Sequence, residues 1–256
     1  MSPSPPPDAA LLTGRSRAHV TDLPDLGCTL HRQVVEPFRA LRAAAAREGI
    51  DLRVASSFRD FERQRLIWND KFSGRRPLLD RAGRVLETTS LDAVSRVEAI
   101  LVWSALPGAS RHHWGTDLDV YDARALPDTA QLRLVPEEYA PGGPFEKLDR
   151  WLDTHLAAQG FFRPYRATPA CAAPQTAAAD GVAPEPWHIS FAALAEAYRV
   201  ALTPPLLAAA LAGAELEGRD CVLQRIEDLH RRFVAKVAAP PAALLAREFS
   251  EHGRVI

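Results

Sequence analysis

The chain has 256 residues, of which 47% are hydrophobic and 25% are charged, as is ordinary for a folded globular protein. Its formal net charge of -1 argues against a general nucleic-acid-binding protein, which needs a basic excess to neutralise phosphates. The length predicts one main domain rather than two equal ones. The three cysteines are far apart and form no Cys-x-x-Cys pair, which argues against a structural zinc site or a disulfide framework.

The sequence shows no run of about twenty apolar residues, so we expect no membrane span. The first residues, Met1–Pro7, lack the basic start and the apolar stretch of a secretory signal. The sequence as written therefore predicts a cytoplasmic protein, or a periplasmic one if the chain leaves by a route that it does not show. Its oligomeric state is not indicated.

Taken in order, the chain begins with Pro-rich, polar residues 1–22, which favour a flexible lead-in. Apolar residues at three- and four-residue steps predict a helix over 33–48, which Gly49 can end. Residues 52–56 predict a short strand that delivers Ser56 and the following residues into a turn. By the same criteria we expect helices over 60–72, 92–106, 144–159 and 221–237, a hairpin over 78–86, strands at 161–162 and 185–191, and a loop over 167–183.

The stretch Ser110–Asp119 carries two histidines, a glycine and two carboxylates within ten residues, a density typical of metal sites but also found in surface loops. Gly115 permits a sharp turn. The chain then alternates as a strand, with Asp117, Asp119 and Tyr121 on one face. Two carboxylates on one face of a buried strand need a cation, an arginine or water nearby.

Two further potential metal ligands, Glu185 and His188, lie on the later strand. With His112 and Asp119 they make a plausible catalytic zinc set, because three protein ligands leave one position for a water whose pKa zinc lowers to about 7. A carboxylate that does not bind the metal can accept the water's proton and pass it to the leaving amine. The spacing to Asp119 favours His112 over His113 as the ligand.

Three motifs occur in order within roughly residues 30 to 200. They are Ser56-x-x-Arg59-x-x-x-x-Gln64, Ser110-x-His112-x-x-Gly115-x-x-x-Asp119 and Glu185-x-Trp187-His188. Together they resemble the zinc D-alanyl-D-alanine carboxypeptidases, which include the vancomycin-resistance type D,D-carboxypeptidases and the L,D-carboxypeptidases of peptidoglycan. The resemblance implies an α+β fold, in which helices pack on a small antiparallel sheet and the zinc site lies at the sheet.

Carried over to this sequence, the resemblance implies one zinc ion bound by His112, Asp119 and His188, with Glu185 as general base and acid. It also implies that Arg59 polarises the scissile carbonyl or holds the terminal carboxylate of the substrate. The substrate contacts that we expect besides Arg59 are Ser56, Gln64, Ser110 and Trp187.

Two of these residues have simpler interpretations. Arg59 could pair with Asp60 or Glu62 at the surface, an interaction usually worth about 0 to 1 kcal/mol. Trp187 could be a wall of the pocket or part of the core.

Two positions depart from the family pattern. The family usually has alanine where this chain has Asp117, and we expect this carboxylate to orient a ligand histidine or to counter Arg59. Pro186 separates Glu185 from His188, which would face opposite sides of a regular strand. Because proline donates no ladder hydrogen bond but tolerates the first position of a strand, we expect Glu185 at or before the strand start.

The function that the resemblance implies is a metallopeptidase that releases C-terminal D-alanine from peptidoglycan stem peptides or muropeptides. The alternatives are a D-Ala-D-Ala dipeptidase or a peptidoglycan endopeptidase on the same fold, and a metal-binding or cell-wall-binding module without turnover. Glu185 favours the enzyme, since a structural zinc site needs no free base. We expect a catalytic domain over 23–202, followed by a helical extension over 203–256 that packs on it.

Overall fold

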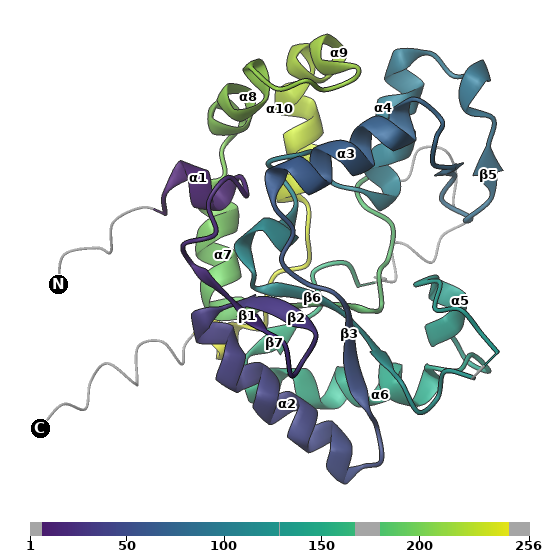
Figure 1. The fold of residues 1–256 in the computed structure, drawn as a ribbon, viewed down its shortest axis with the longest axis vertical. Coiled ribbons are helices and arrows are strands. Elements are labelled where there is room, and N and C mark those ends of the chain that lie inside the picture. Colours follow the sequence, from purple (N-terminus) through teal and green to yellow (C-terminus); the bar gives the residue numbers. More distant parts are fainter. Residues whose placement is uncertain (1–6, 128, 167–179, 246–256) are drawn as a thin grey trace, which may run out of the picture.

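A four-stranded antiparallel sheet lies at the centre of the lower half of the molecule (Figure 1). The computed structural model describes residues 7–127, 129–166 and 180–245. In spatial order the strands are β3 (Leu52–Ser56), β6 (Asp117–Asp122), β8 (His188–Phe191) and β7 (Phe161–Phe162). All three neighbouring pairs are antiparallel, which confirms the expected α+β fold with a small antiparallel sheet.

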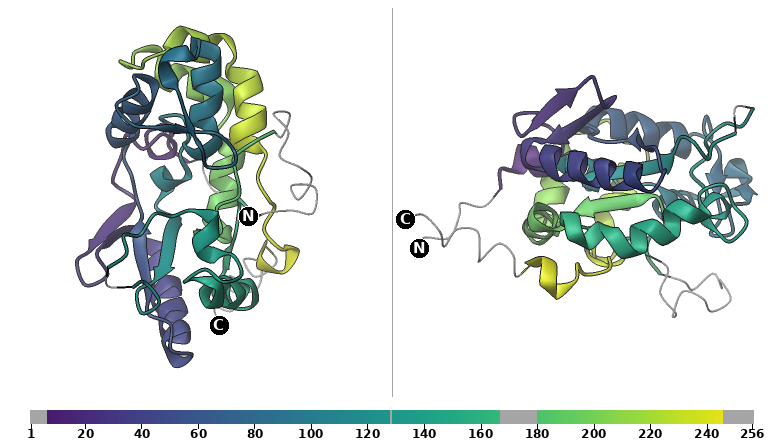
Figure 2. Two further views of the ribbon diagram at one scale, coloured as in Figure 1. Left: turned by 90° about the vertical axis from the view of Figure 1, so that its right-hand side faces the viewer. Right: turned by 90° about the horizontal axis from the view of Figure 1, so that it is seen from below.

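Two helices cover the apolar face of this sheet. α2 (Val35–Arg47) and α6 (Glu146–His155) both lie on the side of the sheet that is seen from below (Figure 2, right). Because side chains alternate across a strand, Leu118 and Val120 of β6 share one face, and Asp119 faces the other. The buried core between sheet and helices includes Phe38, Leu41, Leu52, Leu118, Val120, Leu148, Leu152 and Ile189.

A second core in the upper half joins α3 (Phe61–Phe72) and α4 (Ala93–Trp103) to the C-terminal helices (Figure 1). The indole Nε1 of Trp68 also donates to the carbonyl oxygen of Glu217 at 3.0 Å. The C-terminal helices therefore contact the preceding part of the chain, whereas the division into domains remains a prediction. The buried residues of this core include Phe61, Trp68, Val97, Ile100, Leu207, Leu211, Val222 and Leu229.

The helices begin and end at the capping residues that the sequence provides. The carboxylates of Asp60 and Asp92 accept backbone N–H bonds of 2.8 and 2.7 Å and so cap α3 and α4. Gly160, with φ of 82°, ends the helix formed by α6 and η4 (Leu156–Gln159).

α4 ends at Trp103, three residues earlier than predicted. The other predictions that these bounds confirm are the helices over 33–48, 60–72 and 144–159, the strand over 52–56, and the hairpin of β4 (Leu78–Leu79) and β5 (Val85–Leu86).

The prediction of a flexible lead-in over residues 1–22 is wrong for residues 7–22. These residues form α1 (Ala9–Leu12) and β1 (Val20–Leu23), and β1 pairs with β2 (Cys28–His31). The side chain of Leu12 is buried in the upper core, and its carbonyl oxygen accepts a 3.1 Å hydrogen bond from Nε1 of Trp114. Apolar burial therefore orders a segment whose proline content favoured an extended chain. Residues 1–6 lie outside the described residues.

The helix predicted over 221–237 is interrupted. It divides into α9 (Arg219–Gln224), α10 (Ile226–Leu229) and the π-helical η6 (His230–Ala235). Arg225 lies at the break with φ of -115° and ψ of 13°, and its guanidinium pairs with the carboxylate of Glu98 on α4. The apolar stripe thus predicts the buried face correctly but not this change of helix geometry.

Several further elements complete the chain. Residues 167–179 of the predicted loop lie outside the part of the chain that the structure describes. Among the described helices, each is too short or too polar to span a membrane. The other elements are η1 (Arg32–Val34), η2 (Thr88–Ser90), η3 (Arg111–Trp114), α5 (Pro136–Tyr139), α7 (Ala192–Ala201), α8 (Pro204–Ala212) and α11 (Ala242–Leu245).

Candidate metal centre

A glycine turn separates the two candidate ligands of the central motif. Gly115 ends η3 with φ of 67°, in the left-handed region that glycine adopts without strain. A Cβ atom at this position would lie 2.6 Å from Cγ1 of Val20 and 2.7 Å from the backbone nitrogen of His31. The turn can therefore accept only glycine without rearrangement. It places His112 before the turn and Asp119 on β6 after it.

Strand pairing brings the third candidate ligand to the same place. In the antiparallel register of β6 and β8, Asp119 lies opposite His188. Nδ1 of His188 is 3.3 Å from Oδ1 of Asp119, and Nε2 of His112 is 3.4 Å from Oδ2. One potential ligand atom from each residue lies within 4.8 Å of the other two, and all three side chains are buried.

The donor atoms of this cluster fit a zinc ion. Oδ1 of Asp119 and Nδ1 of His188 are buried and lack a hydrogen-bond partner, and Nδ1 of His112 is likewise unpaired. A buried polar atom without a partner costs about 1 to 3 kcal/mol, a cost that a bound cation would remove for the atoms that it contacts. Two imidazoles and one carboxylate are also a ligand set of catalytic zinc sites, which keep one position open.

The electrostatics of the cluster favour positive charge at its centre. Burial opposes the ionisation of Asp119, but the imidazole of His112 and then that of His188 hold the pKa of this carboxyl well below its usual range. Burial also disfavours the charged form of His188. The neighbouring carboxylates of Asp117, Asp119 and Glu185 outweigh that effect and raise the pKa of this imidazole well above its usual value.

Glu185 lies in a turn immediately before β8, which begins at His188 rather than at residue 185. The turn is closed by a 3.1 Å hydrogen bond from the backbone nitrogen of His188 to the carbonyl oxygen of Glu185. The prediction that Glu185 precedes the strand is therefore confirmed. Because of this turn, Oε2 of Glu185 comes within 3.2 Å of Nδ1 of His188, which a regular strand would not allow.

Asp117 lies on the other side of the His188 ring. Its Oδ1 accepts hydrogen bonds from Nε2 of His188 at 2.9 Å and from Nε of Arg111 at 2.7 Å, and its Oδ2 accepts one from Oγ1 of Thr116 at 2.6 Å. Burial opposes ionisation, but Arg111 and then His188 lower the pKa of this carboxyl to about 2. Of the two expected roles, contact with a ligand histidine matches the geometry, and Arg111 rather than Arg59 is the neighbouring cation.

Arg111 is a functional candidate that the sequence analysis missed. It is buried, and its Nη2 donates to Oγ of Ser190 at 2.7 Å in addition to the bond with Asp117. The signal was present in the sequence, because two carboxylates on a strand face require a cation and an arginine precedes His112 directly.

Arg59 points into the same region and is held by two neighbours. Its Nη1 donates to Oε1 of Gln64 at 2.6 Å and its Nη2 donates to Oγ of Ser56 at 3.1 Å. Burial lowers the pKa of the guanidinium, against the opposing effect of Asp119 and Glu185. The surface-pair interpretation of Arg59 is wrong, because Asp60 caps α3 and Glu62 pairs with Arg65 instead.

His113 is turned away from the cluster. Its Nε2 accepts a 3.0 Å hydrogen bond from the backbone nitrogen of Gly108, so Nδ1 carries the proton and donates to the carbonyl oxygen of Arg59 at 2.5 Å. Burial lowers the pKa of this imidazole to about 3. His113 therefore braces the loop before α3 in its neutral form.

A cleft of about 770 Å³ opens onto the cluster. Trp187 lines this cleft and also packs against the ring of Tyr139, with ring centroids 5.7 Å apart. It is therefore both a wall of the pocket and part of the core. Gln64 and Ser56 do not line the cleft and instead support Arg59. The expected site residues that line it are Arg59, Ser110, His112, Asp119, Glu185, Trp187 and His188, and the lining residues that the sequence did not indicate include Arg81, Arg133, Tyr165, Val182, Phe233 and Val234.

Residues 27–194 match the family model of VanY, described as D-alanyl-D-alanine carboxypeptidase. An uncharacterized protein of Haemophilus influenzae is 50% identical over 99 residues, which cover 38% of this chain and 68% of the relative. Among solved structures, VanYB in complex with D-alanine-D-alanine has a TM-score of 0.48 and 21% identity, covering 73% of this chain and 84% of its own. A mutant of the vancomycin resistance D,D-pentapeptidase VanY in complex with Zn(II) has a TM-score of 0.45 and 24% identity, covering 71% and 83%.

Proposed function

The chain belongs to the D-alanyl-D-alanine carboxypeptidase family represented by VanY, and we propose that it is a zinc-dependent metallopeptidase that releases C-terminal D-alanine from peptidoglycan stem peptides or muropeptides. The observation that carries the proposal is the buried cluster of His112, Asp119 and His188, with a carboxylate oxygen of Glu185 3.2 Å from Nδ1 of His188. A cell-wall-binding module would have no use for a carboxylate at that place. The matching family model, described as D-alanyl-D-alanine carboxypeptidase, supports the choice of substrate class.

In this proposal His112, Asp119 and His188 would hold one zinc ion. Zinc would act there as a Lewis acid, of the kind that polarises a carbonyl and lowers the pKa of water to about 7. The carboxylate of Glu185 would accept a proton from the attacking water and deliver it to the nitrogen of the leaving D-alanine. The side chain of Glu185 is only 13% exposed, so few water molecules compete for that proton.

Arg59 binds the substrate through its guanidinium. Gln64 and Ser56 hold both terminal nitrogens, so the orientation of the guanidinium is fixed before a peptide arrives. The positive charge stabilises either the oxygen of the scissile carbonyl or the terminal carboxylate of D-alanine. Ser110, which is buried beside this cleft, provides a further polar contact.

Asp117 sets the orientation of His188. By accepting from Nε2, its carboxylate would keep the proton on that nitrogen and leave Nδ1, the nitrogen that faces Asp119, to bind the zinc ion. Arg111 compensates the buried charge of Asp117 and ties it to β8 through Ser190. Asp117, which stands where the family usually has alanine, is therefore held in place by Arg111.

The decisive experiment incubates the zinc-loaded protein with muropeptides that carry tetrapeptide and pentapeptide stems and identifies the products by mass. Loss of a single D-alanine supports the carboxypeptidase, loss of D-Ala-D-Ala identifies a dipeptidase, and larger fragments identify an endopeptidase. Glu185→Gln is expected to abolish turnover. Glu62→Gln, which removes a surface carboxylate on α3, serves as the matched control. Absence of product from every peptide, or equal turnover by Glu185→Gln, rules the proposed function out.

A further inference from the structure

Part of the cleft wall comes from residues beyond the family-matched region, which ends at residue 194. Phe233 and Val234 line the cleft, and both belong to η6 in the C-terminal extension. Their neighbours on this wall include Val182, which lies three residues before Glu185. The extension is thus in contact both with the substrate space and with the chain that leads into the proposed base.

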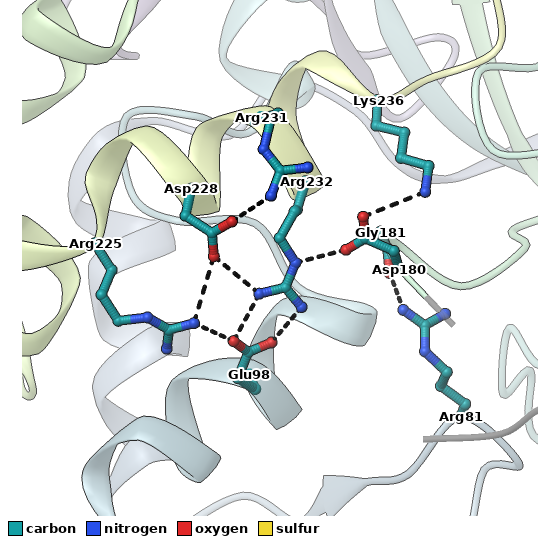
Figure 3. A network of polar contacts seen from close by, with 9 residues as sticks. All are labelled: Arg81, Glu98, Asp180, Gly181, Arg225, Asp228, Arg231, Arg232 and Lys236. Carbon is teal, nitrogen blue, oxygen red and sulfur yellow. Dashed lines mark hydrogen bonds and ion pairs between the residues drawn. The ribbon is translucent and has the colours of Figure 1, made fainter. Parts of the chain in front are cut away.

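Arg232 links the extension to two other segments (Figure 3). Its Nη1 and Nη2 donate to the two carboxylate oxygens of Glu98 on α4 at 2.8 and 2.7 Å, which is a bidentate pair. Its Nε donates to Oδ1 of Asp180 at 2.5 Å. All three nitrogens of one guanidinium are therefore engaged, and they hold Asp180 at a fixed place relative to α4.

From Gly181 to Glu185, every second residue is held by a hydrogen bond to another segment. Arg81 donates to the carbonyl oxygen of Gly181 (Figure 3). The backbone nitrogen of Ala183 donates to the carbonyl oxygen of Val102 at 2.9 Å, and the backbone nitrogen of Glu185 donates to the carbonyl oxygen of Tyr165 at 2.9 Å. Gly181 also packs closely on η6, because a Cβ atom there would lie 3.2 Å from the carbonyl oxygen of Arg232.

We propose that Arg232 is a positioning residue for Glu185, so that the C-terminal extension forms part of the catalytic architecture and not only of the core. The physical reason is that Glu185 lies in a turn, outside the sheet ladder, so its place depends on the segment that enters the turn. Displacing a reacting group by 1 Å can cost about a hundredfold in rate. This inference rests on the proposed function, because it assigns Arg232 a role in the same reaction.

The test compares four variants in stem-peptide turnover. Arg232→Gln removes the link at the extension, and Asp180→Asn weakens it at the other end while leaving the pair of Arg232 with Glu98 intact. Arg231→Gln is the matched control, because Arg231 is the adjacent arginine but forms an exposed ion pair with Asp228. Arg232→Lys keeps the charge and loses the bidentate geometry.

We expect Arg232→Gln and Asp180→Asn to lower kcat about tenfold or more while KM changes less than about threefold, since the base is displaced and the substrate contacts remain. Arg232→Lys should recover part of kcat, and Arg231→Gln should match the wild type. If Arg232→Gln fails to fold, Asp180→Asn decides alone. A kcat of Asp180→Asn equal to that of Arg231→Gln overturns the proposal.

Hydrogen exchange separates this proposal from the proposed function, since it needs no turnover. In Asp180→Asn the amides of Ala183 and Glu185 should exchange faster than in the wild type at an unchanged melting temperature. If the wild type releases no D-alanine but these amides respond, the proposed reaction fails while the positioning of the segment stands. Unchanged exchange at both amides overturns the positioning role itself.

Discussion

Nε2 of His188 lies 2.9 Å from Oδ1 of Asp117, on the edge of the imidazole opposite to the nitrogen that faces Asp119. The ring is thus held between two carboxylates, one of which is itself paired with Arg111 at 2.7 Å. If the cluster binds zinc as proposed, this arrangement makes its metal affinity depend on Asp117, which is not one of the proposed ligands.

Substituting Asp117 separates its effect on the metal from its effect on folding. Asp117→Ala should lower zinc affinity about ten- to a hundredfold, measured by competition with a chelator, because His188 loses the acceptor that orients it. It should also destabilise the fold by about 3 to 5 kcal/mol in urea unfolding, because Arg111 is left buried without its counter-ion. Asp117→Asn retains a hydrogen-bond acceptor, so its zinc affinity and its stability should lie between those of the wild type and of Asp117→Ala. Unchanged affinity and stability in the alanine variant would refute both roles.

The adjacent histidines provide a matched pair for the metal site. His112→Gln should abolish stoichiometric zinc binding, measured by elemental analysis of dialysed protein. His113→Gln should bind one zinc ion like the wild type and lose about 1 to 3 kcal/mol of stability, because the backbone groups of Gly108 and Arg59 lose a buried partner. A zinc-free His113→Gln protein that still unfolds cooperatively would contradict the assignment of ligands.

Gly83, in the hairpin of β4 and β5, provides a control for a substitution of Gly115, because both glycines have positive φ. Gly115→Ala combines left-handed backbone strain with contacts of 2.6 and 2.7 Å to Val20 and His31, so it should cost at least about 2 kcal/mol and reduce zinc binding. Gly83 has φ of 75° but no atom within 4 Å of an added Cβ. Gly83→Ala should therefore cost only about 1 to 2 kcal/mol and leave zinc affinity unchanged. Equal losses in the two variants would show that the close contacts do not matter.

Stability should fall as the pH decreases from about 6.5 to about 4. Burial, with smaller contributions from His19 and Arg32, lowers the pKa of His31 to about 4, so in this range the unfolded chain binds a proton that the folded chain excludes. For one such group the slope is at most about 1.4 kcal/mol per pH unit. His31→Asn keeps a capping side chain at η1 and should show a shallower slope in urea unfolding at pH 5 and 7. Parallel slopes for the two proteins would exclude His31 as the source.

The sequence predicts the elements of this fold better than their interactions. Periodicity and capping residues locate α2, α3 and α6, because each helix buries one stripe against the core. The π-helical turn η6 escapes the same criteria, since its apolar side chains fit an ordinary stripe equally well. The pattern shows that Phe233 is apolar, but only the tertiary structure shows that it borders the cleft.

The candidate site divides in a similar way. The motifs single out the three residues that the structure brings together, and the proline before His188 correctly predicts a bend at Glu185. Arg111 was missed because its partner Asp117 lies across a tight turn, and burial rather than spacing makes the pair necessary. Arg232 was missed because its contact with Asp180 joins segments 52 positions apart.

The antiparallel pairing of Asp119 with His188 also determines when the proposed metal site can form. The two strands are distant in sequence, and a register error of one residue would turn Asp119 to the opposite face of the sheet. An unfolded or misregistered chain therefore offers at most His112 and Asp119, and the proposed zinc site can form only after β6 has paired with β8. The rate at which a coloured or fluorescent metal probe binds during refolding would accordingly measure how fast β6 and β8 pair in the correct register, which is a late folding event.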